Sequence, residues 1–350
     1  MRKQLLLLSL ASSLTGCGTI NFYWQAIGGH LEVLTSSRPI EEVIVDDRVP
    51  AATRAKLDYV RDARRFAVEA LALPDNGSYQ NYADLERPFV LWNVFATPEF
   101  SVTPKEWCFV MVGCVTYRGY FNRDHAEAFA AQLRADGYDV YVAGVAAYST
   151  LGWFSDPVLN TMLRRSDAEV AALLFHELAH QKLYVKGDTT FNESFATVIE
   201  LEGTRRWLAS HNDEAAFGAQ RQRIARHREF TALMLDYRAR LAALYRIEES
   251  DADKRATKQA LLAQIKQDYT HLRSTWDGDT RYDKFFDQAF NNAHFAAVGA
   301  YHGYVDGLQA VLVENGGDLV AFYRAAEVLA RLPSSERAAR LARDSRPADR

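Results

Sequence analysis

The sequence has no excess of basic residues, no internal repeat and no second long apolar run. Its 350 residues carry a formal net charge of -4, and residues of both signs are dispersed along the chain. A nucleic-acid-binding protein would present a clustered basic patch, so we expect no nucleic-acid partner. The remaining composition, 48% hydrophobic and 25% charged, is that of a folded globular protein able to bury one large core or two modest ones.

The N-terminus has the pattern of a bacterial export signal. Two basic residues precede an apolar run at 5–14, which is too short to span a membrane as a mature helix. The run ends in Leu14-Thr15-Gly16-Cys17, which resembles the lipobox of bacterial lipoproteins. We therefore predict a signal peptide at 1–16, lipidation of Cys17 and a location in the envelope, facing the periplasm. Gly18, in place of an aspartate, favours the outer membrane by the same resemblance.

Two further cysteines, Cys108 and Cys114, lie six positions apart in a compartment that permits disulfides. In one straight strand they would be separated by about 20 Å, far beyond bridging distance. A disulfide therefore requires a turn near residues 111–113. The sequence leaves both a disulfide and two buried free thiols open, and neither makes these cysteines catalytic.

The residue pattern predicts an α+β fold that is predominantly helical in its C-terminal half. We expect one domain at 17–335, with a small mixed α/β part at 18–160 in which aromatic and β-branched segments form strands and two amphipathic segments form helices. The expected strands lie within 87–98, 106–117 and 139–148, and the expected helices within 51–73 and 123–138.

The second half reads as helices in succession. We predict two helices at 161–205, a long antiparallel helical hairpin at 206–275 and C-terminal helices at 280–332. The hairpin is indicated by apolar residues at alternating spacings of four and three, namely Phe230, Met234, Tyr237, Leu241 and Leu244, then Leu261, Ile265, Tyr269 and Leu272. We expect the hairpin to have a structural role or to form one wall of a cleft, with a dimerising coiled coil as the alternative. The polar, proline-containing residues 336–350 are expected to form a flexible tail.

The segment "SDAEVAALLFHELAH" carries the chemistry. Ser166 and Glu169 form a capping-box pattern, so a helix is expected to run into His176. His176 and His180 then project from one helix face and can bind one metal ion, while Glu177 between them can activate a metal-bound water. Two imidazoles with an open position for water are typical of a catalytic zinc site, which predicts one Zn²⁺ as cofactor.

The third metal ligand is expected from a returning helix. Gly187 is a natural stop, Thr189 or Thr190 a natural N-cap, and "FNESFATVIELEG" has helical spacing. Such a hairpin can bring Glu193 to the level of the histidines. Glu200 lies seven residues further on the same helix face, so one glutamate is expected to bind zinc while the other orients a histidine. We favour Glu193 as the ligand, with Glu200 as the alternative.

The segments "HELAHQ" and "NESFAT" together resemble the zinc site of gluzincin metallopeptidases, in which a glutamate of an Asn-Glu-x-Phe-Ala segment completes the zinc shell. Twelve residues separate His180 from Glu193, against about eighteen or nineteen in the better-known gluzincins, a spacing that Glu200 would satisfy.

More of the chain resembles a narrower family, the predicted zinc aminopeptidases that Gram-negative bacteria make as lipoproteins. The matching segments are "GHLEVL", "GCVTYRGYF", "AYSTLGWFSDPVL", the zinc segment and "NNAHFAAVGAY". The resemblance implies a zincin-like fold and aminopeptidase activity.

Hydrolysis also requires a group that stabilises the oxyanion of the transition state, and an aminopeptidase requires a group that holds the substrate amino terminus. By residue type, the catalytic candidates besides Glu177 are Tyr117, Tyr148, Tyr301 and His302. The candidates for substrate binding are Arg118, Asp156, Asn192, Asn291 and Asn292.

The leading hypothesis is therefore a zinc-dependent aminopeptidase that removes N-terminal residues from periplasmic peptides. A zinc endopeptidase acting on envelope proteins would use the same ligands. A non-catalytic lipoprotein that keeps the scaffold to bind a partner is the alternative from a different class, and it has no need for Glu177.

Overall fold

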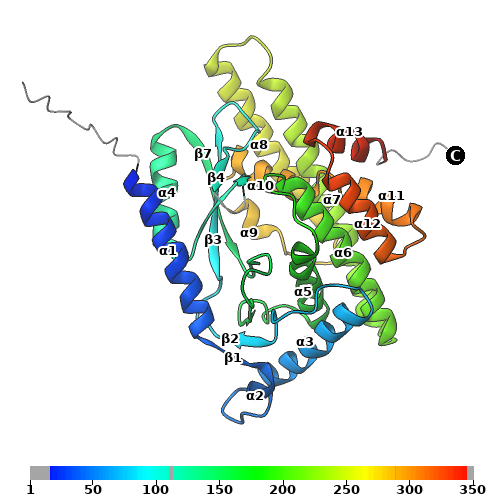
Figure 1. The fold of residues 1–350 in the computed structure, drawn as a ribbon. Helices are drawn as coiled ribbons and strands as arrows, with labels where there is room; N and C mark the ends of the chain where they lie inside the picture. The colour runs from blue at the N-terminus through cyan, green and yellow to red at the C-terminus, as the bar shows by residue number, and fades with distance from the viewer. Residues whose placement is uncertain (1–15, 110–112, 288, 345–350) are drawn as a thin grey trace, which may run out of the picture.

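The computed structural model describes residues 16–109, 113–287 and 289–344, without the side chains of 16–21, 299–302 and 343–344. The predicted signal peptide, apart from Gly16, lies outside the described residues. The chain is a mixed α+β structure, with small sheets on one side and long helices on the other (Figure 1). Every described element after residue 160 is a helix, which confirms the helical second half.

The main sheet has the strand order β6-β3-β7 and is antiparallel throughout. Its strands are β3 (Leu91–Pro98), β6 (Arg118–Tyr120) and β7 (Tyr138–Val145). One face packs Val94 and Val140 against α4 (Arg123–Ala135). The other face turns Tyr141 toward α10 (Asn292–His302), where its ring stacks on His294 at 4.1 Å. Because helices cover both faces, β3 is buried along most of its length and lacks the alternation of a half-exposed strand.

A short disulfide-bridged hairpin forms a separate two-stranded sheet. Cys108 in β4 (Trp107–Phe109) lies opposite Cys114 in β5 (Gly113–Val115), and the two cysteines form a disulfide. A Cβ atom at Gly113 would lie 2.9 Å from the backbone nitrogen of Gly187, so the hairpin packs directly against the loop that joins α5 to α6. A third small sheet joins β1 (Ser37–Pro39), β2 (Asn81–Ala83) and β8 (Val158–Leu159).

The helices α5 (Asp167–Lys182) and α6 (Thr189–Ser210) form the centre of the molecule. They pack against each other, α3 (Ala51–Glu69) lies against α5, and α10 and α11 (Val305–Glu314) lie against α6. Phe175 and Phe195 are fully buried in the core that these helices share. The two short helices are α2 (Ile40–Ile44) and α9 (Asp283–Phe286).

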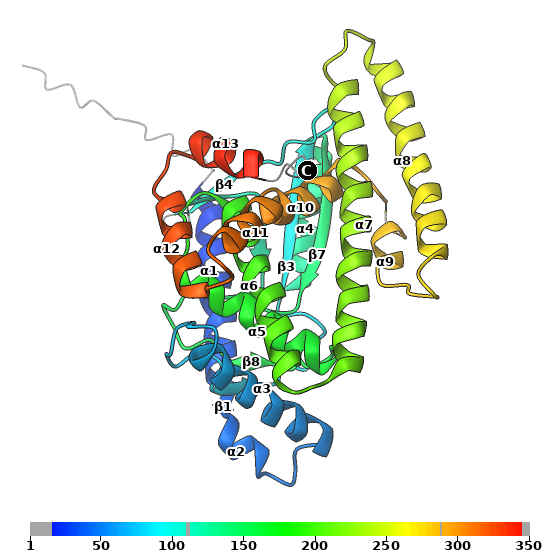
Figure 2. The same ribbon diagram turned by 90° about the vertical axis from the view of Figure 1, so that its right-hand side faces the viewer.

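The predicted long hairpin is present as α7 (Glu214–Leu244) and α8 (Asp251–Ser274), which stand at one side of the molecule and project beyond it (Figure 2). Residues 206–210, expected to begin the hairpin, belong to α6, and α7 starts at Glu214. Most of the positions predicted as apolar contacts, among them Met234 and Ile265, are buried in a second core, and Leu261 and Leu272 are partly buried against it.

The expected flexible tail is replaced in large part by a helix. Residues 336–344 belong to α13 (Ser334–Asp344), which packs on α11 and follows α12 (Leu319–Ala330). Leu341 is buried, and Arg337 forms an ion pair with Asp188, the N-cap residue of α6. The composition of this segment is polar, but these two side chains, four residues apart, give it one face that packs. Only 345–350 lie outside the described residues.

The first helix, α1 (Gly16–Thr35), runs along the outer edge of the molecule beside β6 (Figure 1). Cys17 lies in its first turn, and the side chain of that residue is not described. In the described part of the chain, no helix has the length and hydropathy needed to cross a bilayer.

Candidate metal centre

The helix α5 places two histidines on one face. Ser166 is its N-cap residue, and the carboxylate of Glu169 accepts a hydrogen bond from the Ser166 backbone N–H at 3.2 Å, which confirms the predicted capping box. The helix ends at Lys182, five residues before the predicted stop at Gly187, because Leu183 is extended. His176 and His180 are one helical turn apart and their ring centroids are separated by 4.9 Å.

The helix α6 returns the chain to the same level. Its N-cap is Asp188, whose carboxylate accepts from the Phe191 N–H at 2.9 Å, and neither Thr189 nor Thr190 has this role. Asn192 donates to the Val185 carbonyl at 2.8 Å and accepts from the Val185 N–H at 2.7 Å. This two-sided contact fixes the loop between α5 and α6, and it sets the position of the residue that follows.

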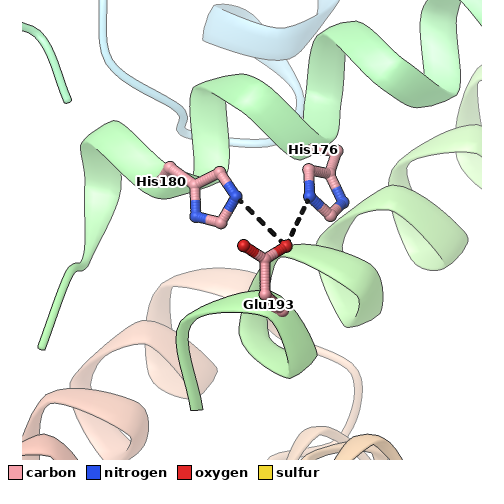
Figure 3. A group of neighbouring side chains, drawn as sticks. All are labelled: His176, His180 and Glu193. Atoms are coloured by element: carbon pink, nitrogen blue, oxygen red, sulfur yellow. Dashed lines mark ion pairs between the residues drawn. The ribbon is translucent and has the colours of Figure 1, made fainter. Parts of the chain in front are cut away.

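That residue, Glu193, completes a cluster that can hold a metal ion. One carboxylate oxygen of Glu193 lies 3.4 Å from Nε2 of His176 and 3.7 Å from Nε2 of His180 (Figure 3). One ligand atom from each of the three residues lies within 4.8 Å of the others. Bonds of about 2.1 Å in a tetrahedral arrangement place neighbouring ligand atoms about 3.4 Å apart. The two distances from Glu193 to the histidines are close to this spacing, so these three residues could hold a tetrahedral ion such as Zn²⁺.

Glu200 lies behind His176 and outside this cluster. Its carboxylate is 3.2 Å from Nδ1 of His176, and Arg223 of α7 lies 3.5 Å from its second oxygen. Burial alone would raise the pKa of Glu200, but the bond to His176 and the charges of His176 and Arg223 lower it to about 2. An ionised Glu200 fixes the His176 ring with Nε2 toward the cluster. This geometry favours Glu193 as the ligand and Glu200 as the residue that orients the histidine.

The two histidines have different surroundings. Burial lowers the pKa of His180 to about 4, and its Nδ1 has no hydrogen-bond partner among the described residues. Burial also acts to lower the pKa of His176, but hydrogen bonds to Glu193 and Glu200 outweigh it and raise that pKa well above its ordinary value. A metal ligand must be neutral at the binding nitrogen, so metal binding at His176 releases a proton.

Glu177 lies at the edge of the cluster without belonging to it. Its side chain is buried, and burial together with the negative charges of Glu193 and Asp156 raises its pKa to about 7 despite the opposing charge of His176. A carboxyl group in this range can both accept and return a proton at neutral pH.

The structure brings one described tyrosine candidate to the cluster. Burial and the negative charges of Glu193 and Glu177 raise the pKa of Tyr117 above its ordinary range, which shows that the phenol lies close to both carboxylates. Tyr148 instead pairs with His30, whose Nδ1 lies 2.6 Å from the phenol oxygen. The side chains of Tyr301 and His302 lie outside the described residues.

Arg118 lies away from the metal cluster. It pairs across the sheet with Val94, on the face covered by α4, and its guanidinium stacks over the rings of Phe22 and Phe129 at 4.2 and 4.6 Å. Neighbouring residues of a strand point to opposite faces. Tyr117, which directly precedes β6, has its ring 5.6 Å from that of Phe95, the neighbour of Val94 in β3, so it lies on the sheet face opposite to that of Arg118.

The asparagine candidates have structural contacts. Asn291 is the N-cap of α10, and its amide donates to the Val140 carbonyl at 3.1 Å. Asn292 is fully buried, donates to the Glu99 carbonyl and accepts from Tyr245. Asn192 is used by the loop described above. All three amides are therefore used in hydrogen bonds that hold the segments around the site together.

Asp156 is also buried, at 1% exposure. One of its oxygens accepts the Thr150 N–H at 2.8 Å, and the other has no hydrogen-bond partner among the described residues. Burial raises the pKa of Asp156 to about 6. Its charge acts on Glu177, so it influences the site through the electrostatic field.

Two residues of the site had not been singled out. Arg223 reaches Glu200 from α7, and no local sequence signal connects it to the motif. Tyr184 follows His180 by four residues, and the charge of Glu193 contributes, after burial, to raising its pKa. The i,i+4 spacing from His180 was a usable signal for Tyr184, although the helix ends at Lys182.

Comparisons with known proteins agree with this site at the level of a family. The family model described as "Putative aminopeptidase" matches residues 21–341, which include every metal-ligand candidate. No curated protein and no solved structure matches the chain. The chain therefore belongs to the putative aminopeptidase family.

Proposed function

We propose that the protein is a gluzincin-like, zinc-dependent aminopeptidase that removes N-terminal residues from periplasmic peptides. The observation that carries the proposal is the convergence of His176, His180 and Glu193 within 4.8 Å, with Glu177 buried beside them. A purely structural helix pair has no reason to bury two carboxylates and two imidazoles face to face, because each charged group loses hydration.

In this mechanism His176, His180 and Glu193 hold the metal, and Glu200 keeps the His176 ring in the binding orientation. When bound there, Zn²⁺ supplies a Lewis acid for the substrate carbonyl and lowers the pKa of water. Side chains of the protein carry out the proton transfers and stabilise the oxyanion.

Glu177 takes a proton from the attacking water and returns it to the leaving amine. Its pKa, raised to about 7 chiefly by burial, suits both transfers. Tyr117 donates a hydrogen bond to the oxyanion that develops on the carbonyl oxygen. The charges of Glu177 and Glu193 act on this phenol, so it lies near the reacting atoms and remains protonated at neutral pH.

The test is cleavage of a peptide library by zinc-loaded protein, read by mass spectrometry, with each peptide in a free and an N-acetylated form. We expect the loss of single N-terminal residues from free peptides only, and none with Glu177→Gln. Internal cleavage of both forms would replace the aminopeptidase with an endopeptidase. No cleavage that depends on Glu177 would favour the non-catalytic scaffold.

We also propose that the protein is a lipoprotein of the outer membrane, anchored through Cys17. The lipobox-like "LTGC" supports the anchor, and the Cys108–Cys114 disulfide fits an oxidising compartment. Incorporation of labelled palmitate into the protein in bacterial cells, and its loss in Cys17→Ser, is the expected result. Equal labelling of both proteins would refute the anchor.

A further inference from the structure

Large apolar side chains lie exposed along one face of α1. Trp24, Ile27 and Leu31 are 69%, 51% and 53% exposed, and their spacings of three and four place them in one stripe, here called the α1 stripe. Tyr23 beside it is 39% exposed. Single exposed apolar residues are ordinary, but a row of them on one helix indicates a contact surface.

The opposite face of α1 is the one that packs on the protein. The Phe22 ring stacks on Phe109 at 5.2 Å, and Val33 is fully buried. Gly29 lies so close to Phe121 that no Cβ atom fits between them. These contacts fix the rotation of the helix about its own axis, so the α1 stripe faces away from the protein.

The stripe also lies close to the proposed anchor. Cys17 precedes Trp24 by seven residues within the same helix, a distance of about 10 Å along the axis. Leu31, at the far end of the stripe, lies about 21 Å from Cys17 by the same rise per residue.

The composition of α1 suits a lipid surface. Its twenty residues contain one charged side chain, Glu32, which pairs with Arg87 at 3.3 Å. Tryptophan and tyrosine are the side chains most favoured at the boundary between headgroups and acyl chains. Exposed apolar surface also continues beside α1, where Phe154, 50% exposed, packs on the His30 ring at 4.6 Å.

We infer that the α1 stripe is a membrane-binding surface, and that α1 lies flat on the bilayer with Trp24, Ile27 and Leu31 below the headgroups. The lipid at Cys17 and the stripe then act together, since one acyl anchor alone binds reversibly while two signals hold a protein stably. The inference rests on the proposed anchor for its location and goes beyond the proposed peptidase activity.

The experiment places an environment-sensitive fluorophore on single introduced cysteines of the full chain, purified from bacterial membranes and reconstituted into phosphatidylethanolamine/phosphatidylglycerol vesicles. Ile27→Cys and Leu31→Cys report on the stripe. Val313→Cys is the matched control, because Val313 is an apolar residue 75% exposed on α11, on the other side of the molecule from α1 in Figure 1. Labelling of the unmodified parent gives the background from the native cysteines, and circular dichroism checks that each variant is folded.

We expect nitroxide lipids to quench the labels at Ile27 and Leu31 and to leave the label at Val313 unchanged. Water-soluble iodide should quench the label at Val313 and leave the labels at Ile27 and Leu31 unchanged. Flotation of the same vesicles reports the anchor separately. Protein that floats without nitroxide quenching would overturn the inference and leave the anchor in place. Labels shielded from both quenchers would also overturn it, because a protein partner would then cover the stripe. Protein that neither floats nor is quenched would refute both proposals.

Discussion

The substitution Glu200→Gln tests the division of roles between the two glutamates of α6. Glutamine keeps the shape of the side chain but removes the negative charge that faces Nδ1 of His176 at 3.2 Å. Loss of such an outer carboxylate typically weakens metal binding by about 10- to 100-fold, or about 1.4 to 2.7 kcal/mol. We therefore expect Glu200→Gln to bind Zn²⁺ more weakly than the parent but still to bind it.

The assay is competition for Zn²⁺ against a fluorescent chelator at fixed pH. Glu193→Gln removes a ligand atom and is expected to weaken binding far more than Glu200→Gln does. Glu202→Gln is the matched control, because Glu202 lies on the same helix and pairs with Arg205 and Arg206 at 2.7 Å, outside the cluster. Its Zn²⁺ affinity should equal that of the parent.

Two results would refute this reasoning. Complete loss of binding in Glu200→Gln, with binding kept in Glu193→Gln, would make Glu200 the ligand. An affinity unchanged in Glu200→Gln would mean that the orientation of His176 does not depend on this carboxylate. Urea unfolding of each variant, measured without metal, separates a loss of affinity from a loss of folding.

Four further predictions follow from single contacts. Arg337→Met breaks a buried ion pair and should lower the free energy of unfolding in urea by about 3–5 kcal/mol; a loss below 1 kcal/mol would contradict the role given to α13. Replacing Cys108 and Cys114 with serine opens a short loop and should cost about 2 kcal/mol, whereas an unchanged urea midpoint would mean that the bridge adds nothing. Tyr117→Phe should lower kcat about 10²- to 10³-fold at nearly constant KM, and full activity would remove it from the mechanism. Burial raises the pKa of Asp156 to about 6, so the folded protein keeps this proton to a higher pH than the unfolded chain does, and stability falls as the pH rises from about 4 to about 6. Asp156→Asn should therefore gain stability relative to the parent across that window, and a gain independent of pH would refute this.

The helix α5, which carries His176 and His180, could be predicted from the sequence because its signals are local. The capping box at Ser166 and the spacing of His176 and His180 depend only on α5. The sequence predicted Glu193 as the third ligand, with Glu200 as the alternative. A helical hairpin brings the second helix back beside His176 and His180 whichever of the two glutamates faces them. The choice between Glu193 and Glu200 depends on the loop geometry set by Asn192, which spacing alone does not give.

The rest required contacts between distant segments. Arg223 lies on α7, and its link to Glu200 exists only once α7 packs beside α6. The C-terminal segment looked polar and unstructured because the partner of Arg337, Asp188, is 149 residues away in the sequence. Tyr117 and Tyr148 were equivalent by residue type, and only contacts between distant segments separate them: the charges of Glu193 and Glu177 act on Tyr117, whereas Tyr148 pairs with His30.

The ion pair between Arg337 and Asp188 joins two residues that are made at different stages of synthesis. Asp188 caps the helix that carries Glu193, yet its partner lies close to the end of the chain. During synthesis, all three metal-ligand candidates emerge long before Arg337, the residue that pairs with the N-cap of α6. A chain cut short before α13 retains His176, His180 and Glu193 but lacks the ion pair at the start of α6, so that helix gains its buried partner only after α13 has been made.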